Sequence, residues 1–221
     1  MPSSTIEDYL KQIYLHQPGS TSGLLSMGNL SEAMDVAPGT ATAMVKRLAE
    51  ATLVRYEPYA GVRLTARGQR LAINVLRRHR LIESFLVEVL GLDWSEVHEE
   101  AEHLEHVISD RLLERIDAVL GHPVVDPHGD PIPGPDGRIA SDSSLTLVDV
   151  APGTSVTVER VLAQDEAFLS YADANGLRPG RHVTVLSKDA VAKSVTVQAE
   201  DAKPVSLSID VASLWVVTAK P

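Results

Sequence analysis

Cysteine is absent from the 221 residues of this chain. Its absence excludes disulfide bonds, zinc sites built from cysteine tetrads and catalysis by a thiol, and it leaves the redox compartment undetermined. Long apolar runs are also missing, since no stretch approaches the roughly 20 residues of a membrane-spanning helix. The first residues, MPSSTIEDYL, form neither a basic nor an apolar targeting segment. The sequence therefore predicts a soluble, cytoplasmic protein.

Motifs of the common enzyme classes are missing as well. There is no P-loop, dinucleotide-binding glycine fingerprint or nucleophile elbow. One pattern suggests a metallohydrolase, because His98-Glu99 is followed by His103. The zincin motif needs its second histidine four residues after the first, whereas a spacing of five turns the imidazoles about 140° apart on a helix. We therefore expect no enzymatic activity.

Basic residues are missing from one long stretch, because no Lys or Arg lies between Arg80 and Arg111 while nine carboxylates do. Within it the segment HEEAEHLEH interleaves histidine with the acids. On a helix, four of its side chains share a face about 100° wide: His98, Glu102, Glu105 and His106. Apolar residues occupy the other side: Ala101, Leu104, Val107, Ile108 and Leu112. An acidic helix is usually only a solvated surface, but the interleaved imidazoles favour a divalent-metal site that relieves the repulsion.

Two long amphipathic helices are predicted to carry these groups. The first extends from Thr65 to about Gly91 and places His79 and Glu83 one turn apart. The second begins near Ser95, a candidate N-cap, and continues without a break to Gly121. Their wide apolar faces are typical of a dimer interface, and the alternative is packing within one chain.

The N-terminal third differs in charge from the rest. The whole chain has a formal net charge of −10, yet residues 1–75 carry seven Lys/Arg against six Asp/Glu. This near-neutral segment has helix-turn-helix spacing: a helix through Ile6–Tyr14 that also carries Asp8, a second at Met27–Met34, and a third that opens at Pro38. Two extended runs, LVRYEPY and GVRLTARG, follow and predict a two-stranded wing. The alternative is a three-helix bundle with a hairpin.

The third helix is the predicted DNA-recognition helix. Its small and hydroxylated N-terminal residues allow close approach to a major groove, and basic residues follow where phosphates would pass. The expected DNA-binding residues are Pro38, Gly39, Thr40, Thr42, Ala43, Lys46, Arg47 and, from the wing, Arg63.

The pattern changes after Gly121. Residues 122–144, HPVVDPHGDPIPGPDGRIASDSS, are rich in Pro, Gly and Asp and lack periodicity, as in a linker. Five short alternating runs follow and predict a small barrel: SVTVERVLA, HVTVLSKD, KSVTVQAE, VSLSIDV and LWVVTA. The expected fold is mainly α with a C-terminal all-β domain. Its segments are a winged-helix DNA-binding domain (1–72), a helical dimerisation and metal-binding domain (73–121), the linker (122–147) and the barrel (148–221).

Several of these motifs together resemble the diphtheria-toxin-repressor family of metal-dependent transcriptional regulators in its three-domain form. The similarity rests on EDYLKQIY, PGTATAMVKRL, RLTARG, RRHRLIESFL, HEEAEHLEHVISD and GDPIPG. It implies a winged helix-turn-helix, a helical dimerisation and metal domain, and an SH3-like (FeoA-like) C-terminal domain. It also implies an activating metal such as Fe(II) or Mn(II).

The resemblance assigns a set of metal ligands: Asp8, His79, Glu83, His98, Glu102, Glu105 and His106. The iron-sensing branch has Met and Cys where this chain has Asp8 and Glu102, so the ligands resemble those of the manganese branch, and hard oxygens suit Mn(II). Mn(II) is the expected metal and Fe(II) the alternative, with Zn(II) or Co(II) as substitutes in vitro. The C-terminal domain can lend a ligand in three-domain members, and Asp165 and Glu166 are the acidic candidates here.

Lys11 departs from the pattern of the short two-domain manganese regulators, which have a second acidic ligand at that position. Their closely paired two-metal arrangement is therefore not expected in this chain. The implied partners are palindromic double-stranded operator DNA and a second copy of the chain, with no membrane and no small-molecule substrate. The implied role is repression of metal-uptake genes, and the remaining alternative is a metal-storage or chaperone module. A chain truncated at the linker is expected to keep its metal-dependent DNA binding.

Overall fold

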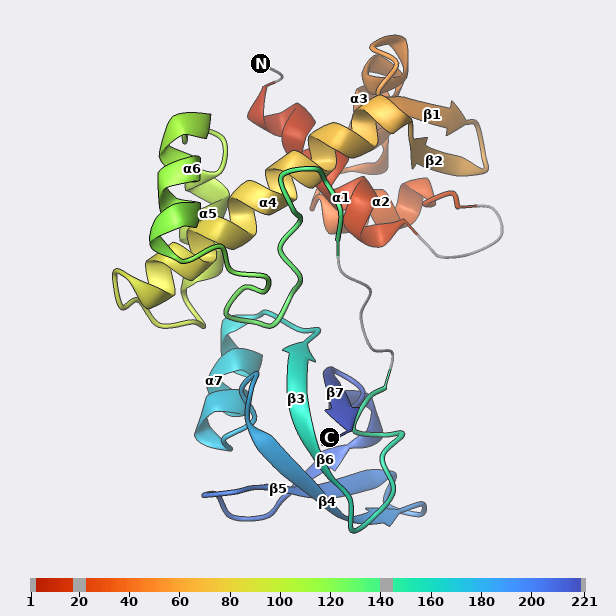
Figure 1. Cartoon of the computed structure of the whole chain (residues 1–221). Helices are drawn as coiled ribbons and strands as arrows, with labels where there is room; N and C mark the ends of the chain where they lie inside the picture. The colour runs from red at the N-terminus through yellow and green to blue at the C-terminus, as the bar shows by residue number, and fades with distance from the viewer. Residues whose placement is uncertain (1–2, 18–22, 140–144, 220–221) are drawn as a thin grey trace. The chain divides into compact units, whose positions relative to one another are not determined.

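The computed structural model describes residues 3–17, 23–139 and 145–219 and is drawn in Figure 1. The chain forms two compact units. Unit 1 comprises residues 1–79, 105–108 and 133–138, and unit 2 comprises residues 80–104, 109–132 and 139–221. No helix in the described ranges combines the length and apolar character needed to cross a bilayer.

Unit 1 begins with three helices, α1 (Ser4–His16), α2 (Met27–Ala33) and α3 (Pro38–Glu50). The Ser26 hydroxyl caps α2 by accepting the N–H of Asn29, and Pro38 occupies the first turn of α3, where its missing N–H costs nothing. Asp35 adopts a left-handed φ of 48° in the turn between them. The predicted helix-turn-helix is confirmed.

A two-stranded antiparallel hairpin follows, made of β1 (Val54–Glu57) and β2 (Gly61–Leu64). Val62 pairs with Leu25, which ties the hairpin to the segment before α2. Tyr59, at the tip, is fully exposed and has a φ of 66°. This hairpin is the predicted wing. The hairpin shares a hydrophobic core with the three helices. The largest buried residues of this core include Leu10, Ile13, Leu30 and Leu48.

Three further helices follow the wing: α4 (Ala66–Glu88), α5 (Val97–Leu104) and α6 (Asp110–Val119). The prediction of one unbroken helix from about Ser95 to Gly121 is therefore wrong. Residues 105–109 form a turn, after which the Ser109 hydroxyl accepts the N–H of Leu112 and starts a new helix. The hydroxyl of Ser95, the candidate N-cap, donates to Asp93 at 2.6 Å, and α5 begins two residues later at Val97. The break removes Glu105 and His106 from the helix face on which they were expected.

The predicted apolar face of this segment is only partly buried. Ala101 is buried, whereas Leu104, Val107 and Leu112 are exposed by 39%, 76% and 52% in the single chain. Packing within one chain therefore does not cover this face.

Unit 2 contains a five-stranded antiparallel sheet in the order β6-β5-β4-β3-β7 (Figure 1). Its strands are β3 (Ser155–Val161), β4 (His182–Asp189), β5 (Ser194–Ala199), β6 (Val205–Ser208) and β7 (Trp215–Ala219). Two helices interrupt the strands, α7 (Glu166–Ala174) and α8 (Ile209–Ala212). The strand of the fourth predicted pattern, VSLSIDV, is shorter than expected, because Ser208 caps α8. The helical domains and the C-terminal sheet domain confirm the predicted fold class.

Trp94, in the connection between α4 and α5, is 2% exposed and belongs to the same core as the sheet residues Val156, Val158 and Trp215. Part of the predicted linker is also ordered, since Val125 and Pro131 within it form a β-bridge and the His128 carbonyl accepts the N–H of Val161 from β3. Residues 140–144 of the linker lie outside the described residues. The four-segment division of the sequence remains a prediction.

Candidate metal centres and DNA-binding surface

Polar side chains of unit 1 gather where α1 meets the turn after α5. We call this group the unit 1 cluster; it comprises Glu7, Asp8, Lys11, His79, Glu105 and His106. Helical spacing places the three α1 residues on one side, and the break at residue 105 brings the turn to them. His106 lies 2.8 Å from Glu7 Oε2 through Nδ1 and 2.7 Å from Asp8 Oδ1 through Nε2.

Glu105 is the fully buried centre of this cluster, with 0% exposure. Its Oε1 accepts a hydrogen bond from Lys11 Nζ at 2.7 Å, and its Oε2 lies 2.7 Å from His79 Nδ1. His106 Nε2 lies 3.4 Å from the same Oε1. Burial lowers the pKa of His106, but the hydrogen bond to Glu7 and the charges of Asp8 and Glu105 outweigh burial and raise this pKa overall. The cluster therefore favours positive charge at this position.

A second group lies in unit 2 around Glu83. We call it the unit 2 cluster; it comprises Glu83, His98, Asp126 and His128. Glu83 Oε1 lies 3.2 Å from His98 Nδ1, and Oε2 lies 3.7 Å from His128 Nδ1. Glu83, Asp126 and His128 are buried and each offers a ligand atom within 4.8 Å of the others'. Among the described residues, Asp126 Oδ2 and His128 Nδ1 have no hydrogen-bond partner.

Burial raises the pKa of Asp126 to about 8, and the neighbouring carboxylates Glu83 and Asp130 contribute to the increase. Arg80 opposes it only in part, because its Nε lies 3.7 Å from Asp126 Oδ2, beyond hydrogen-bond distance. Clustered acids in a dry pocket are costly unless a cation neutralises them. A buried, unsatisfied carboxylate oxygen beside an unsatisfied imidazole nitrogen therefore fits a divalent metal.

The loop that carries Asp126 and His128 is held by its own backbone and by β3. Asp126 Oδ1 accepts the N–H groups of His128 and Asp130 at 2.8 and 2.9 Å. The His128 carbonyl accepts the N–H of Val161 at 3.0 Å. Gly129 has a φ of +87°, and a Cβ there would lie 2.0 Å from the carbonyl oxygen of Glu159. Only glycine allows this approach to β3.

Trp94 fixes the orientation of His128. His128 Nε2 lies 2.8 Å from the Trp94 carbonyl oxygen, which can only accept, so Nε2 carries the proton. Nδ1 then faces Glu83 and Asp126. Burial lowers the pKa of His128, but these two carboxylates outweigh burial and raise this pKa overall. The two rings stack with centroids 5.6 Å apart. This arrangement of a metal-binding histidine with its other nitrogen bonded to a carbonyl is common in metal sites.

Six of the seven ligands assigned from the sequence belong to these two groups. Asp8, His79, Glu105 and His106 belong to the unit 1 cluster, and Glu83 and His98 belong to the unit 2 cluster. Glu102 lies three residues before Glu105 in the chain, with Oε1 3.6 Å from His98 Nε2. Two of the four residues expected on one helix face, Glu105 and His106, lie in the turn after α5 instead.

The two acidic candidates of the C-terminal domain, Asp165 and Glu166, lie at the start of α7. Asp165 caps α7, because its Oδ1 accepts the N–H of Phe168 at 2.9 Å. Asp165 and Glu166 also line a cavity of about 380 Å³ in unit 2, together with His98. Their assignment as ligands remains a prediction.

Sequence reasoning missed Asp126 and His128. Both lie in the Pro/Gly-rich segment, whose composition pointed to a linker. A signal was present, because Asp-Pro-His-Gly sets two metal-binding side chains two residues apart in a stretch of turn-forming residues.

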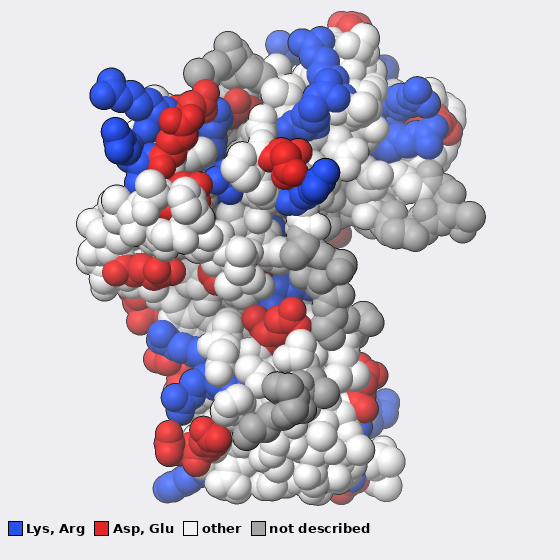
Figure 2. All heavy atoms as spheres, viewed as in Figure 1, with Lys and Arg blue, Asp and Glu red and all other residues white. Residues whose placement is uncertain are grey.

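The expected DNA-binding residues of α3 lie on its accessible side in unit 1. Pro38, Gly39, Thr40 and Ala43 are exposed in the first two turns, and Lys46 and Arg47 are exposed beyond them. Thr42 is half-buried and donates to the Pro38 carbonyl at 2.8 Å. Arg63 of the wing lies 3.8 Å from Glu57. Figure 2 shows basic side chains gathered over the end of unit 1 that holds α3 and the hairpin.

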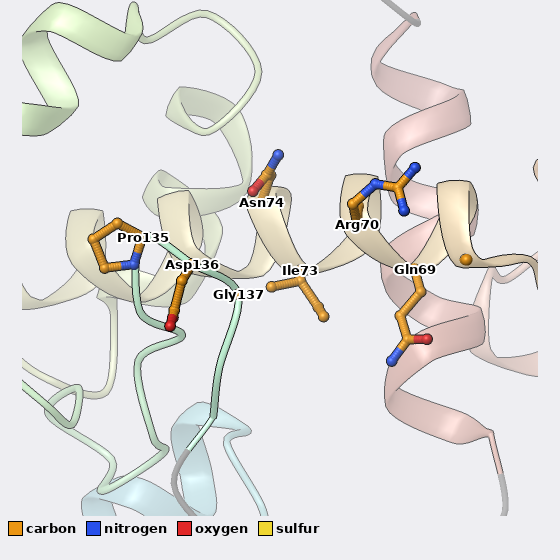
Figure 3. Close-up of a pocket in the computed structure, with 8 residues that line it drawn as sticks. Gln69, Arg70, Ile73, Asn74, Pro135, Asp136 and Gly137 are labelled. Carbon is orange, nitrogen blue, oxygen red and sulfur yellow. The ribbon is translucent and has the colours of Figure 1, made fainter.

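A groove of about 480 Å³ lies elsewhere in unit 1, between α4 and the loop of residues 135–137 (Figure 3). Gln69, Arg70, Ile73 and Asn74 line it from the helix. Its lining offers one carboxylate, Asp136, and no imidazole, so it lacks the donors of a metal centre.

Comparison with known families accounts for most of the chain. The model of the iron-dependent repressor N-terminal DNA-binding domain matches residues 1–62. That of the iron-dependent repressor metal-binding and dimerisation domain matches residues 65–134, and that of the FeoA domain matches residues 145–218.

Individual relatives cover nearly the whole chain. The iron-dependent repressor IdeR of Mycobacterium leprae (strain TN) is 34% identical over 199 residues, which are 84% of this chain and 85% of the relative. A solved structure of a manganese-dependent transcriptional repressor in complex with manganese has 39% identity and a TM-score of 0.87, covering 97% of this chain and 100% of that one. The structure of the manganese regulator SloR has 34% identity and a TM-score of 0.77, with 100% of both chains covered.

Proposed function

Because this chain belongs to the iron-dependent repressor family, which includes the diphtheria toxin repressors, we propose that it is a manganese-sensing repressor of metal-uptake genes. The family consists of metal-dependent, DNA-binding transcriptional repressors and not of enzymes. The observation that carries the choice of manganese is the chemistry of the donors. Every proposed ligand in both clusters is a carboxylate oxygen or an imidazole nitrogen, and the chain has no cysteine.

Hard oxygen donors with imidazole suit Mn(II), whereas thiolate and thioether ligands favour softer metals. Mn(II) is nevertheless at the weak end of the affinity series, so geometry and availability must provide selectivity. An Fe(II)-responsive regulator with the same two clusters is the alternative. IdeR, named for iron, and the manganese repressors are both similar to this chain at comparable identity.

We assign the metal to both clusters. Glu83, His98, Asp126 and His128 hold it in unit 2. His79, which the resemblance assigns as a ligand and which lies beside Glu105 in the unit 1 cluster, is a further proposed ligand. Asp8, Glu105 and His106 hold the metal in unit 1. Glu102, three residues before Glu105 in the chain and also assigned by the resemblance, is a further proposed ligand. Two features support the assignment: the unsatisfied Asp126 Oδ2 and His128 Nδ1, and the convergence of carboxylate and imidazole ligand atoms to within 4.8 Å of one another. When bound, the metal supplies positive charge and a fixed coordination geometry.

The mechanism follows from where the unit 1 ligands reside. Asp8 is on α1, the first helix of the DNA-binding domain, whereas Glu105 and His106 precede α6 in the segment matched to the dimerisation domain. Shared ligation therefore fixes α1 against that segment. In a homodimer this fixes the spacing of the two recognition helices, which must be about 34 Å to enter successive major grooves of a palindromic site. By reciprocity, operator DNA tightens metal binding.

The test is operator selection from random duplexes with metal-free protein, with and without Mn(II), followed by titration of the selected duplex. We expect sequence-specific binding only with Mn(II), lost on adding a chelator. If Fe(II) activates DNA binding under anaerobic conditions at a lower free concentration than Mn(II), the result would favour the Fe(II)-responsive alternative. Metal binding with no selected DNA sequence would favour a storage module.

Exchanging two ligands for sulfur should change the metal preference. Asp8→Met with Glu102→Cys replaces hard oxygens by soft donors. We expect the free Mn(II) needed for half-maximal DNA binding to rise at least about tenfold relative to that for Fe(II). Anaerobic DNA-binding titrations with each metal measure this ratio. Glu100→Cys, on the exposed side of α5, is the control and should leave the ratio unchanged. An unaltered ratio in the double variant would exclude these residues as ligands.

Removing two basic side chains of α3 should weaken binding to all DNA sequences by about the same factor. Lys46→Ala with Arg47→Ala removes two phosphate contacts, so the slope of log affinity against log salt should fall by about two. Arg181→Ala with Lys203→Ala removes the same charge from exposed positions of the sheet domain and serves as the control. Equal salt slopes for the two double variants would contradict the α3 assignment.

A further inference from the structure

Lys11 is a lysine buried inside a proposed metal centre. It is 2% exposed, and its Nζ donates to Glu105 Oε1 at 2.7 Å. Glu105 has 0% exposure, and its other oxygen lies 2.7 Å from His79 Nδ1. A buried ammonium at this distance from a buried carboxylate compensates its charge, and either group alone would be strongly unfavourable.

The two clusters differ in this respect. In unit 2 the Arg80 Nε lies 3.7 Å from Asp126 Oδ2, too far for a hydrogen bond. In unit 1 the ammonium is in direct contact with Glu105, the carboxylate that His106 also approaches at 3.4 Å. A metal ligated by Glu105 must share that carboxylate with a fixed positive charge.

We infer that Lys11 is a built-in cation that holds the unit 1 cluster together without metal and lowers its affinity for metal. The inference rests on the proposed function, because it assumes that Asp8, Glu105 and His106 bind Mn(II). Like charges at short distance repel, and the repulsion is strong where water is excluded. The unit 2 centre therefore fills first. The unit 1 centre, to which α1 contributes Asp8, fills only at a higher metal concentration. Lys11 sets the concentration at which the DNA-binding domain responds.

The test compares Lys11→Met with the wild-type full-length protein by calorimetric Mn(II) titration and by thermal unfolding of the metal-free form. Methionine keeps the length of the side chain and removes its charge. We expect a lower melting temperature without metal and at least tenfold tighter Mn(II) binding at the weaker site. The gain in melting temperature on adding Mn(II) should increase accordingly. Lys203→Met, which removes an exposed lysine of the sheet domain, should change none of these quantities.

A second background localises the effect. With Asp8→Ala the weaker site should be lost, and Lys11→Met should then leave the remaining Mn(II) affinity unchanged. Lys11→Gln keeps a hydrogen-bond donor for Glu105 without the charge, so it should tighten Mn(II) binding with a smaller loss of stability. If Lys11→Met folds only with Mn(II), that result would itself support the inference. The Mn(II) affinity would then be measured with Lys11→Gln.

The contrary outcomes are distinct. A merely structural lysine would lower the melting temperature and leave the weaker Mn(II) affinity unchanged or reduced, and that result would overturn the inference. Variants that do not fold even with saturating Mn(II) would also overturn it, since the ammonium would then be needed alongside the metal. A wild-type protein that binds no Mn(II) would instead refute the proposed function.

Discussion

His128→Gln is expected to abolish Mn(II)-dependent binding to operator DNA. His128 is fully buried, and its Nδ1 faces the Glu83 and Asp126 carboxylates without a hydrogen-bond partner among the described residues. Removing a metal-binding nitrogen should weaken Mn(II) binding at this centre by at least about a hundredfold, since even outer-shell partners of such ligands are worth 10- to 100-fold. Calorimetric titration and DNA-binding assays at matched free Mn(II) measure the two effects.

The matched control is His103→Gln, the same exchange at an exposed position of α5. It should leave both Mn(II) affinity and DNA binding unchanged. Because His128 is buried, the melting temperature of metal-free protein must be recorded for both variants. A folded His128→Gln protein that still responds to Mn(II) like the control would show that the response does not need the unit 2 cluster.

Truncation after Ile139 should also be severe, contrary to the expectation from the sequence. The sheet provides the core around Trp94, and it provides the Val161 N–H that binds the His128 carbonyl. Arg160 and Gln164 contact Asp130 at 3.2 and 2.7 Å. Without these contacts the loop that carries Asp126 and His128 loses its support. We expect the unit 2 Mn(II) site to disappear and metal-dependent DNA binding to fall at least tenfold.

Tryptophan fluorescence provides a direct measurement. The full chain has two tryptophans, Trp94 and Trp215, and the truncated chain retains only Trp94. Its emission should shift to the red, as expected for an indole transferred from a core to water. Trp215→Phe in the full chain isolates Trp94 in its native surroundings as the control. A truncated protein with blue-shifted emission and wild-type Mn(II) affinity would establish that residues 1–139 suffice.

The elements of the fold were largely predictable because each has a local signal. Alternating apolar residues marked all five strands, and Pro38 at a helix start with a turn before it marked the recognition helix. The break between α5 and α6 was missed because the apolar pattern continues across it. Ser109 followed by Asp110 is a helix-start signal that could have revealed the break.

The candidate centres were predictable only in part. The spacing of histidine and acidic residues identified ligands within one helix or turn. It could not predict the contact between Lys11 and Glu105, which are 94 residues apart in the chain. Asp126 and His128 were hidden because a segment rich in Pro, Gly and Asp can be either a free linker or an ordered loop. Only packing against β3 decides between the two.

The close approach of Gly129 to β3 has a consequence for biosynthesis. The loop that presents Asp126 and His128 takes its shape from Glu159, Arg160 and Val161, which are translated about 30 residues later. A nascent chain that has just exposed His128 therefore lacks the strand that orders it. We expect the proposed unit 2 centre to bind metal only after synthesis of β3, so that newly made protein gains this centre only once its C-terminal sheet has begun to form.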